Sequence, residues 1–166
     1  MKLFFSSLLF LFCVNTIANE NIKMPAKAEV FQLSTFPCFG ACPQYDFYVF
    51  SDNSYLFIGN KFVDHLGFYK GQFTQNEYQS LLNILKKFDF SNFQDHYRGG
   101  DKQCTQMMTD HPSIELKLQS TELNKEIHHY LGCKGFEKEI PLLQLEEKIK
   151  TLLHISSFIK TNDNPT

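Results

Sequence analysis

Four cysteines are the residues of this sequence whose spacing most directly suggests chemistry. Cys38 and Cys42 are separated by three residues and followed by Pro43, whereas Cys104 and Cys133 lie much farther along the chain. Three uses of Cys38 and Cys42 are open: a structural disulfide, a redox-active pair, or two ligands of a copper or zinc ion. A redox pair needs a thiolate at the start of a helix, and the surrounding sequence predicts strands. We therefore expect structural disulfides.

The histidines and carboxylates form no recognisable catalytic constellation. His128 and His129 are adjacent on a predicted strand, so their side chains leave opposite faces and cannot share one metal ion. Asp110 and His111 fall in a predicted loop. The sequence has no His-x-x-Glu-His motif, no Gly-x-Ser-x-Gly elbow and no phosphate-binding glycine loop. It therefore predicts a protein that is not an enzyme, with no catalytic residues, no cofactor and no metal site.

The composition is that of an ordinary globular domain and excludes some partners. The chain has 166 residues, of which 43% are hydrophobic and 20% charged, with a formal net charge of −2. Arg98 is the only arginine, and arginine is the preferred residue for bidentate contacts to phosphate and guanine. We therefore expect a protein or small-molecule partner of unknown identity and no nucleic acid.

The first residues predict export from the cytoplasm. Lys2 precedes an apolar run of about twelve residues, too short for a helix that spans a bilayer, and Ala18 ends a segment suited to signal peptidase. We expect a signal peptide at residues 1–18, a flexible lead-in at 19–27, one domain at 28–158 and a flexible tail at 159–166. The mature chain would have no transmembrane helix and would be periplasmic or extracellular. A lipid anchor at Cys13 is disfavoured because a bulky residue precedes that cysteine.

Periodicity predicts a sheet of short strands. Alternating, aromatic or β-branched runs predict strands at residues 29–35, 45–51, 54–59, 68–73, 113–119 and 125–131. Between the second and third of these, Asp52-Asn53 predicts a type I′ turn. The resulting hairpin has more aromatic residues than one buried face needs. We take these as a candidate binding surface, namely Tyr48, Phe50, Tyr55 and Phe57.

Two helices are predicted to complete an α+β fold. Thr74 and Glu77 form a capping box at the start of a helix over residues 75–88. Pro141 suits the first position of a last helix, on which Glu146 and Lys150 would form a surface ion pair. Residues between the first helix and the fifth strand are expected to form a loop. The fold class is therefore an antiparallel β-sheet of hairpins packed against two α-helices in a single domain.

The chain resembles a known family through a motif at the first cysteine pair. The segment reads Cys-Phe-Gly-Ala-Cys-Pro-Gln-Tyr over residues 38–45, and weaker matches follow as far as residue 153. On these residues the chain is similar to the domain of unknown function 6438 family of bacterial exported proteins and lipoproteins. The family has no established activity, so the resemblance implies a fold and a location only. Its motif positions here are Gly40, Pro43, Tyr45, Asp110, Pro112, His129, Tyr130 and Gly132.

Four cysteines allow three pairings, and local geometry favours one of them. Gly40 lets the chain turn between Cys38 and Cys42, which favours a local disulfide and leaves Cys104 to pair with Cys133. Both crossed pairings stay open. Taken together, the sequence predicts an exported cell-envelope domain that is a non-enzymatic binding or structural module. The alternative is a periplasmic thiol-redox or copper- or zinc-binding protein that uses Cys38 and Cys42.

Overall fold

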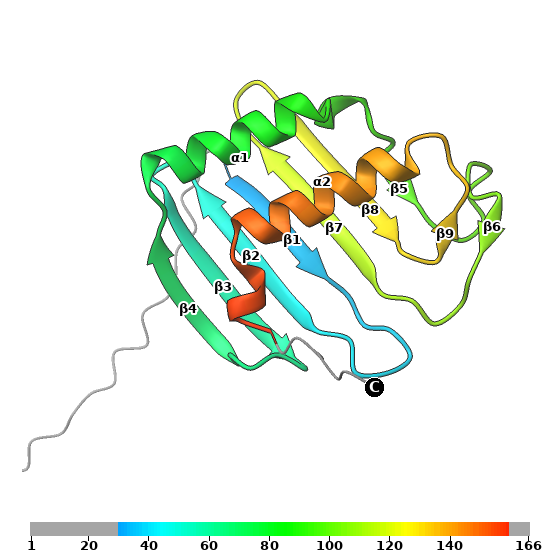
Figure 1. The fold of residues 1–166 in the computed structure, drawn as a ribbon, viewed down its shortest axis with the longest axis horizontal. Coiled ribbons are helices and arrows are strands. Elements are labelled where there is room, and N and C mark those ends of the chain that lie inside the picture. Colours follow the sequence, from blue (N-terminus) through cyan, green and yellow to red (C-terminus); the bar gives the residue numbers. More distant parts are fainter. Residues whose placement is uncertain (1–29, 160–166) are drawn as a thin grey trace, which may run out of the picture.

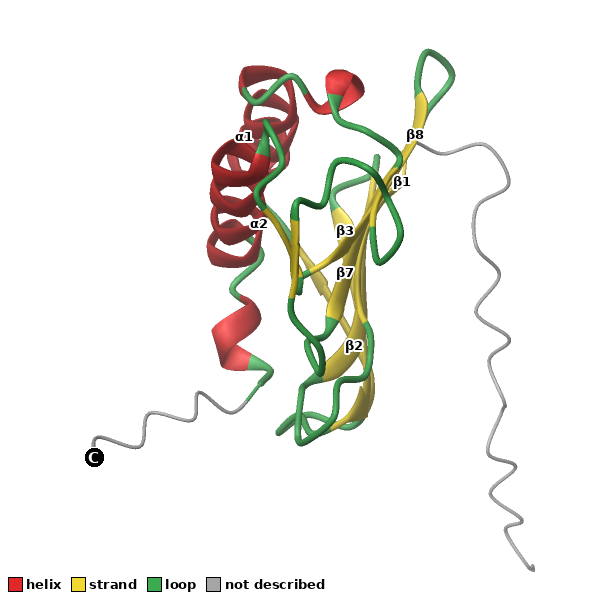
Figure 2. Ribbon diagram, turned by 90° about the vertical axis from the view of Figure 1, so that its right-hand side faces the viewer, coloured by secondary structure: helices red, strands yellow, loops and turns green. Residues whose placement is uncertain are grey.

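The structure, a computed structural model, describes residues 30–159 as a seven-stranded sheet with two α-helices on one face (Figures 1 and 2). The strand order is β4-β3-β2-β1-β7-β8-β5, and β6 pairs with β9 in a separate ladder. The helices are α1 (Gln75–Lys87) and α2 (Glu139–Leu152), with the 3-10 turns η1 (Phe90–Asn92) and η2 (Ile155–Ser157). The strands are β1 (Val30–Thr35), β2 (Gln44–Phe50), β3 (Ser54–Lys61), β4 (Gly67–Gln72), β5 (His96–Tyr97), β6 (Gln106–Met107), β7 (Ser113–Gln119), β8 (Asn124–Tyr130) and β9 (Cys133–Lys134).

The predicted α+β class, with a mostly antiparallel sheet and two helices, is confirmed, with one correction in the segment expected to be a loop. That segment contains η1, β5 and β6. β5 joins the edge of the sheet and runs parallel to β8, so the sheet is antiparallel except at this edge. A two-residue strand carries no detectable periodicity, which is why the sequence did not reveal it. The predicted signal peptide and lead-in lie outside the described residues.

Helix α1 begins where the capping box predicts. The Thr74 hydroxyl accepts a hydrogen bond from Glu77 N at 3.2 Å, and Thr74 N donates to the Glu77 carboxylate at 2.8 Å. Tyr78, Leu81 and Leu85 form its buried stripe against the sheet. The helix therefore forms from local signals and is fixed in place by burial of one face.

Helix α2 departs from prediction in two respects. It begins at Glu139, so Pro141 is the third helical residue, where its missing N–H would still have had no partner inside the helix. Glu146 is not on the surface and does not pair with Lys150; it is 3% exposed and faces the sheet beside Leu142 and Ile149. Glu146 lies four residues after Leu142 and three residues before Ile149. It therefore lies on the same side of the helix as these two residues, within the buried stripe.

The turn between β2 and β3 is not of type I′. That turn needs positive φ at two central residues, whereas only Asn53 has one here, at 66°. Asn53 N donates to Phe50 O at 2.9 Å, and Asp52 accepts hydrogen bonds from the amide and hydroxyl of Ser54. The loop therefore has three residues, which shifts the register so that Val49 lies opposite Tyr55.

This register divides the aromatic residues of the hairpin between two faces of the sheet. Tyr55 and Phe57 share the face of Phe47, which is covered by α1, α2 and η2, and Phe57 is fully buried. Only Tyr48 and Phe50 lie on the opposite face, which no helix among residues 30–159 covers (Figure 2). A two-residue turn would have paired Phe50 with Tyr55 and put all four on one face. The predicted four-residue surface is therefore wrong for Tyr55 and Phe57, and Phe50 is also buried, at 8% exposure, so Tyr48 is the only one of the four that is partly exposed on the open face.

Candidate functional site

Both disulfides of the favoured pairing are present in the structure. Cys38 and Cys42 are joined with their Cα atoms 5.8 Å apart, and the backbone turns at Gly40, whose φ of 147° suits glycine. Thr35 closes the base of this loop: its hydroxyl donates to Pro43 O at 2.8 Å and accepts from Tyr45 N at 3.1 Å. The loop is thus fixed at both ends.

The tip of this loop presents an aromatic side chain to solvent. Phe39 is 87% exposed, and Phe36, just before the loop, is 37% exposed. A phenylalanine ring gains nothing from exposure to water. The loop therefore presents an apolar residue at its tip, on a backbone constrained by the disulfide and by Thr35.

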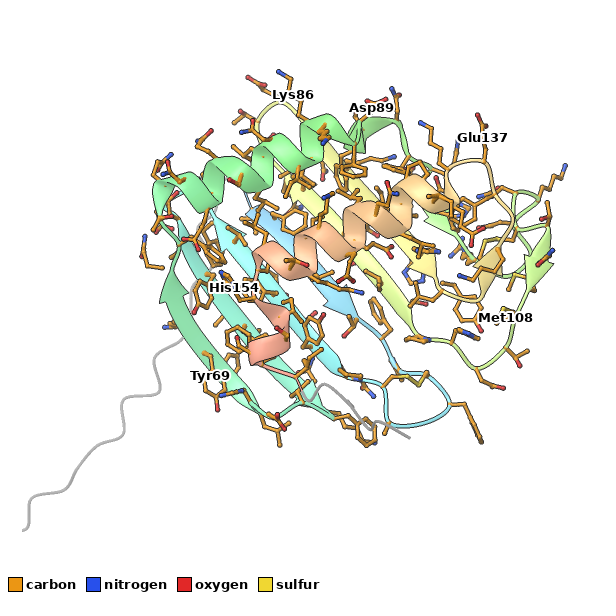
Figure 3. All side chains as sticks on the ribbon, in the orientation of Figure 1. Tyr69, Lys86, Asp89, Met108, Glu137 and His154 are labelled. Atoms are coloured by element: carbon orange, nitrogen blue, oxygen red, sulfur yellow. A yellow bond between two sulfur atoms is a disulfide. The ribbon has the colours of Figure 1, made fainter. Side chains whose placement is uncertain are left out.

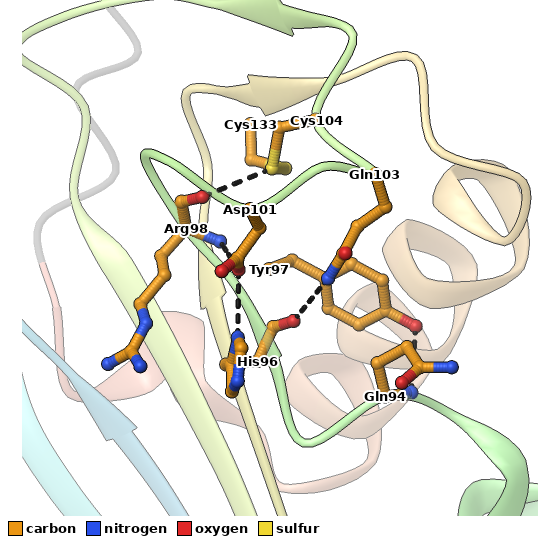
Figure 4. Close-up of polar contacts among 8 residues, drawn as sticks. All are labelled: Gln94, His96, Tyr97, Arg98, Asp101, Gln103, Cys104 and Cys133. Atoms are coloured by element: carbon orange, nitrogen blue, oxygen red, sulfur yellow. Dashed lines mark hydrogen bonds and ion pairs between the residues drawn. A yellow bond between two sulfur atoms is a disulfide. The ribbon is translucent and has the colours of Figure 1, made fainter.

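The second disulfide fastens an irregular segment to the end of the sheet (Figure 4). Cys104 and Cys133 are joined with their Cα atoms 5.1 Å apart. Asp101 accepts a hydrogen bond from Arg98 N at 2.7 Å and lies 2.8 Å from His96 Nδ1. Although partial burial raises the pKa of Asp101, its contacts with His96 and Arg98 outweigh that effect and hold the pKa below its usual range. These contacts act within the loop and order it.

The later motif residues fasten two further segments to each other. Tyr130 donates its hydroxyl hydrogen to Met108 O at 2.8 Å, Met108 N donates to Gly132 O at 2.8 Å, and Leu131 N donates to Pro112 O at 3.0 Å. A Cβ at Gly132 would lie 2.1 Å from Met108 O, so no side chain fits there. The motif at residues 129–132 therefore allows the backbone after β8 to lie close to the backbone before β7.

A pocket of about 200 Å³ lies on the helix side of the sheet, beside the first disulfide loop and the segment before β7. One wall is the first disulfide loop, another is the segment before β7, and the third is the end of α2 and the chain after it. Lys150 is the only charged residue among the described residues that line it. The apolar lining consists of Pro43, Tyr45, Pro112, Ile114, Leu131 and Ile159.

The comparisons with known proteins identify the family of the chain. The family described as Domain of unknown function (DUF6438) matches residues 29–153. The chain belongs to this family. No curated protein matches it. Three DUF6438 motif positions quoted above, Pro43, Tyr45 and Pro112, line the pocket, and Gly40 shapes the loop beside it.

Another DUF6438 motif residue, His129, forms a polar pair in the core. His129 Nδ1 lies 2.7 Å from Glu146 Oε1, and the two side chains are 1% and 3% exposed. The rings of Tyr97 and Phe136 stack on each other at 4.2 Å and meet the imidazole edge at 6.0 and 5.5 Å. His129 Nε2 has no hydrogen-bond partner in the described part of the chain. The pair joins α2 to β8 and is closed to solvent.

The sequence missed Glu146, although a signal for it existed. The sequence places the apolar residues Leu142, Leu145 and Ile149 at helical spacing, and position 146 lies between them on the same side of the helix. Its charge led to a surface assignment, because glutamate is rarely buried unless it has a partner. His129, seventeen residues earlier, supplies that partner.

The open face of the sheet carries a polar network and no metal-binding cluster. Ser34 donates to Asp46 at 2.5 Å, and His128 Nδ1 lies 3.7 Å from Glu115 Oε2. Burial, and then the charges of Asp46 and Glu115, raise the pKa of Tyr48. His128 and His129 lie on opposite faces as predicted. Within residues 30–159, no three His, Cys, Asp or Glu side chains are placed to hold a metal ion.

Proposed function

We propose that this DUF6438 chain is an exported cell-envelope domain that works as a non-enzymatic binding or structural module. The two disulfides carry the proposal. Cys38, Cys42 and Cys104 are partly accessible, and disulfides with accessible cysteines form and persist mainly in oxidising compartments. No helix among the described residues is long and apolar enough to cross a membrane.

The acid and base groups support binding over catalysis. A histidine that contacts a carboxylate could act as a general base, and the shortest such contact is between His129 and Glu146. Both side chains are buried, and Tyr97 and Phe136 pack against the histidine. A general base must come within hydrogen-bond reach of the proton it removes. Asp101 is held by His96 and by the backbone of its own loop. These groups therefore stabilise the fold.

The alternative, thiol-redox or copper or zinc chemistry at Cys38 and Cys42, has weaker support. The segment after Cys38 is a loop followed by β2, so no helix N-terminus stabilises a thiolate there. The carbonyl of Cys38 accepts a hydrogen bond from Gly40 N, which is a turn contact. The loop therefore has the features of a structural disulfide.

The test is the redox state and location of the chain in its native cell. Maleimide labelling of intact cells before lysis, followed by fractionation and mass spectrometry, should find a mature chain without free thiols in an envelope fraction. Elemental analysis of the purified chain should find no stoichiometric copper or zinc. Four reactive thiols in the cytoplasm would contradict export, and two reactive thiols with one bound metal ion would establish the alternative.

A further inference from the structure

The pocket beside the first disulfide differs in charge from other cavities of the domain. A cavity of about 250 Å³ near the end of α1 is lined by both Lys86 and Asp89. Another of about 260 Å³ near the start of α2 is lined by both Lys138 and Glu137. Figure 3 shows Lys86, Asp89 and Glu137 along the edge of the molecule opposite to the β1–β2 loop. In those cavities a carboxylate accompanies the lysine, whereas no described carboxylate lines the pocket with Lys150.

Lys150 forms no ion pair with a carboxylate of the described residues, and Glu146 is engaged elsewhere. Glu146, one helical turn before it, points into the core and contacts His129. No ion pair to Lys150 exists within residues 30–159. Glu147 is exposed and lies outside the pocket lining, although its charge adds to burial in raising the pKa of Tyr45. Among the residues that the structure describes, the pocket therefore combines apolar walls with one ammonium group that no carboxylate contacts.

The size of the pocket limits what can enter. A cavity of about 150 Å³ accommodates a benzene ring, and pockets for drug-sized ligands have roughly 300 Å³ or more. At about 200 Å³ this pocket matches one large apolar side chain. The ammonium group of Lys150 adds a site for an anion next to that side chain.

The surroundings of the pocket indicate a polypeptide. Cys42 and Pro43 line the pocket, and Phe39 is on the same loop, exposed and held by the disulfide. A small carboxylate inside the pocket would leave Phe39 in water. A chain that leaves the pocket across the loop would cover it, and phenylalanine is enriched at protein interfaces relative to the rest of the surface.

We propose that this pocket binds the C-terminal residue of a partner polypeptide, with its apolar side chain between Tyr45 and Leu131 and its α-carboxylate on Lys150. The inference rests on the proposed function, because it assigns a binding site to the proposed binding module. It names the chemistry of the partner: a polypeptide that ends in a large apolar residue with a free carboxylate.

The probe is a fluorescein-labelled peptide, Gly-Ser-Gly-Ser-Phe, with a free C-terminus, titrated with oxidised protein and followed by fluorescence anisotropy. The free acid should bind at least about tenfold more tightly than the C-terminal amide, a difference of about 1.4 kcal/mol. Lys150→Gln should remove this preference, and Glu147→Gln should preserve or increase it. Phe39→Ala should weaken binding of the peptide. The affinity for hexanoate, measured by its competition with the labelled peptide, should not change.

Changes in the amide chemical shifts on addition of the peptide show where it binds. The same spectra show whether each variant is folded. Shifts confined to residues 35–45, 112–114, 131 and 150 support the site, and matched spectra of the free variants show that each one is folded. Equal binding of acid and amide, no effect of Lys150→Gln, or hexanoate binding without peptide binding would each overturn the proposal. Because the assay uses purified oxidised protein, its failure leaves the evidence for export unchanged.

Discussion

The buried contact between His129 and Glu146 gives the sharpest test of the fold. We consider Glu146→Leu, His129→Leu and the double variant. In Glu146→Leu, His129 Nδ1 loses the oxygen at 2.7 Å, and at 1% exposure its side chain can reach no water in exchange. In His129→Leu the carboxylate is buried alone. Removal of one partner of a buried ionic pair costs about 3–5 kcal/mol.

The double variant should recover much of this loss. When both partners are replaced by apolar groups of similar volume, no polar atom is left unsatisfied, and such replacements are often neutral or stabilising. We expect the double variant within about 1–2 kcal/mol of the parent, so the coupling energy of the pair should exceed about 3 kcal/mol. A domain of this size is stable by roughly 5–15 kcal/mol, so either single variant should lose a large part of its stability.

The assay is urea unfolding at pH 7 followed by far-UV circular dichroism, because the chain has no tryptophan for fluorescence. Glu147→Leu is the matched control, since its carboxylate is on the same helix and exposed. This control should change the free energy of unfolding by about 0.5 kcal/mol or less. A Glu146→Leu effect as small as the control, or a double variant that loses the sum of both singles, would refute a role of the pair in stability.

Three further predictions concern the motif end of the sheet. Cys104→Ser opens a disulfide with a sequence separation of 29 residues, so it should cost about 3–4 kcal/mol and speed hydrogen exchange in the β5–β6 segment while the β2–β3 hairpin stays protected. Gly132→Ala should cost about 1–3 kcal/mol in thermal unfolding because its Cβ would meet Met108 O, whereas Gly99→Ala, with its nearest contact at 3.4 Å, should cost less. Burial, reinforced by Glu147, raises the pKa of Tyr45 above the unfolded value of 10.0, so the folded state keeps the hydroxyl proton longer. Stability should therefore fall with a slope of up to about 1.4 kcal/mol per pH unit above pH 10, and Tyr45→Phe should reduce that slope in urea titrations.

Local signals predicted most of the fold. The alternation of Ile114, Leu116 and Leu118 defines β7, and the capping box of Thr74 and Glu77 defines the start of α1. These features depend on residues within one element, so a single sequence contains them. The class and the antiparallel arrangement follow from their order along the chain.

Features that depend on register or on a distant partner were harder to predict. One added residue in the β2–β3 turn moves Tyr55 and Phe57 from the open face to the core. Burial of Glu146 depends on His129, which is on a different element. The pocket is formed by segments from residues 35 to 159, and no motif marks Lys150 as part of it. Its lack of an ion pair within residues 30–159 depends in part on Glu146, which contacts His129 instead.

The placement of the disulfides indicates what they stabilise. The first disulfide closes a loop after β1 that carries Phe39 and lines the pocket, whereas the second contains Cys133, which is part of the hydrophobic core, and Cys104, which packs against that core. The first disulfide therefore constrains the pocket wall, and the second stabilises the end of the core. Loops that are already ordered lose little conformational entropy on binding, which leaves more of the contact energy as affinity. The placement of the first disulfide is therefore what we expect beside a binding surface.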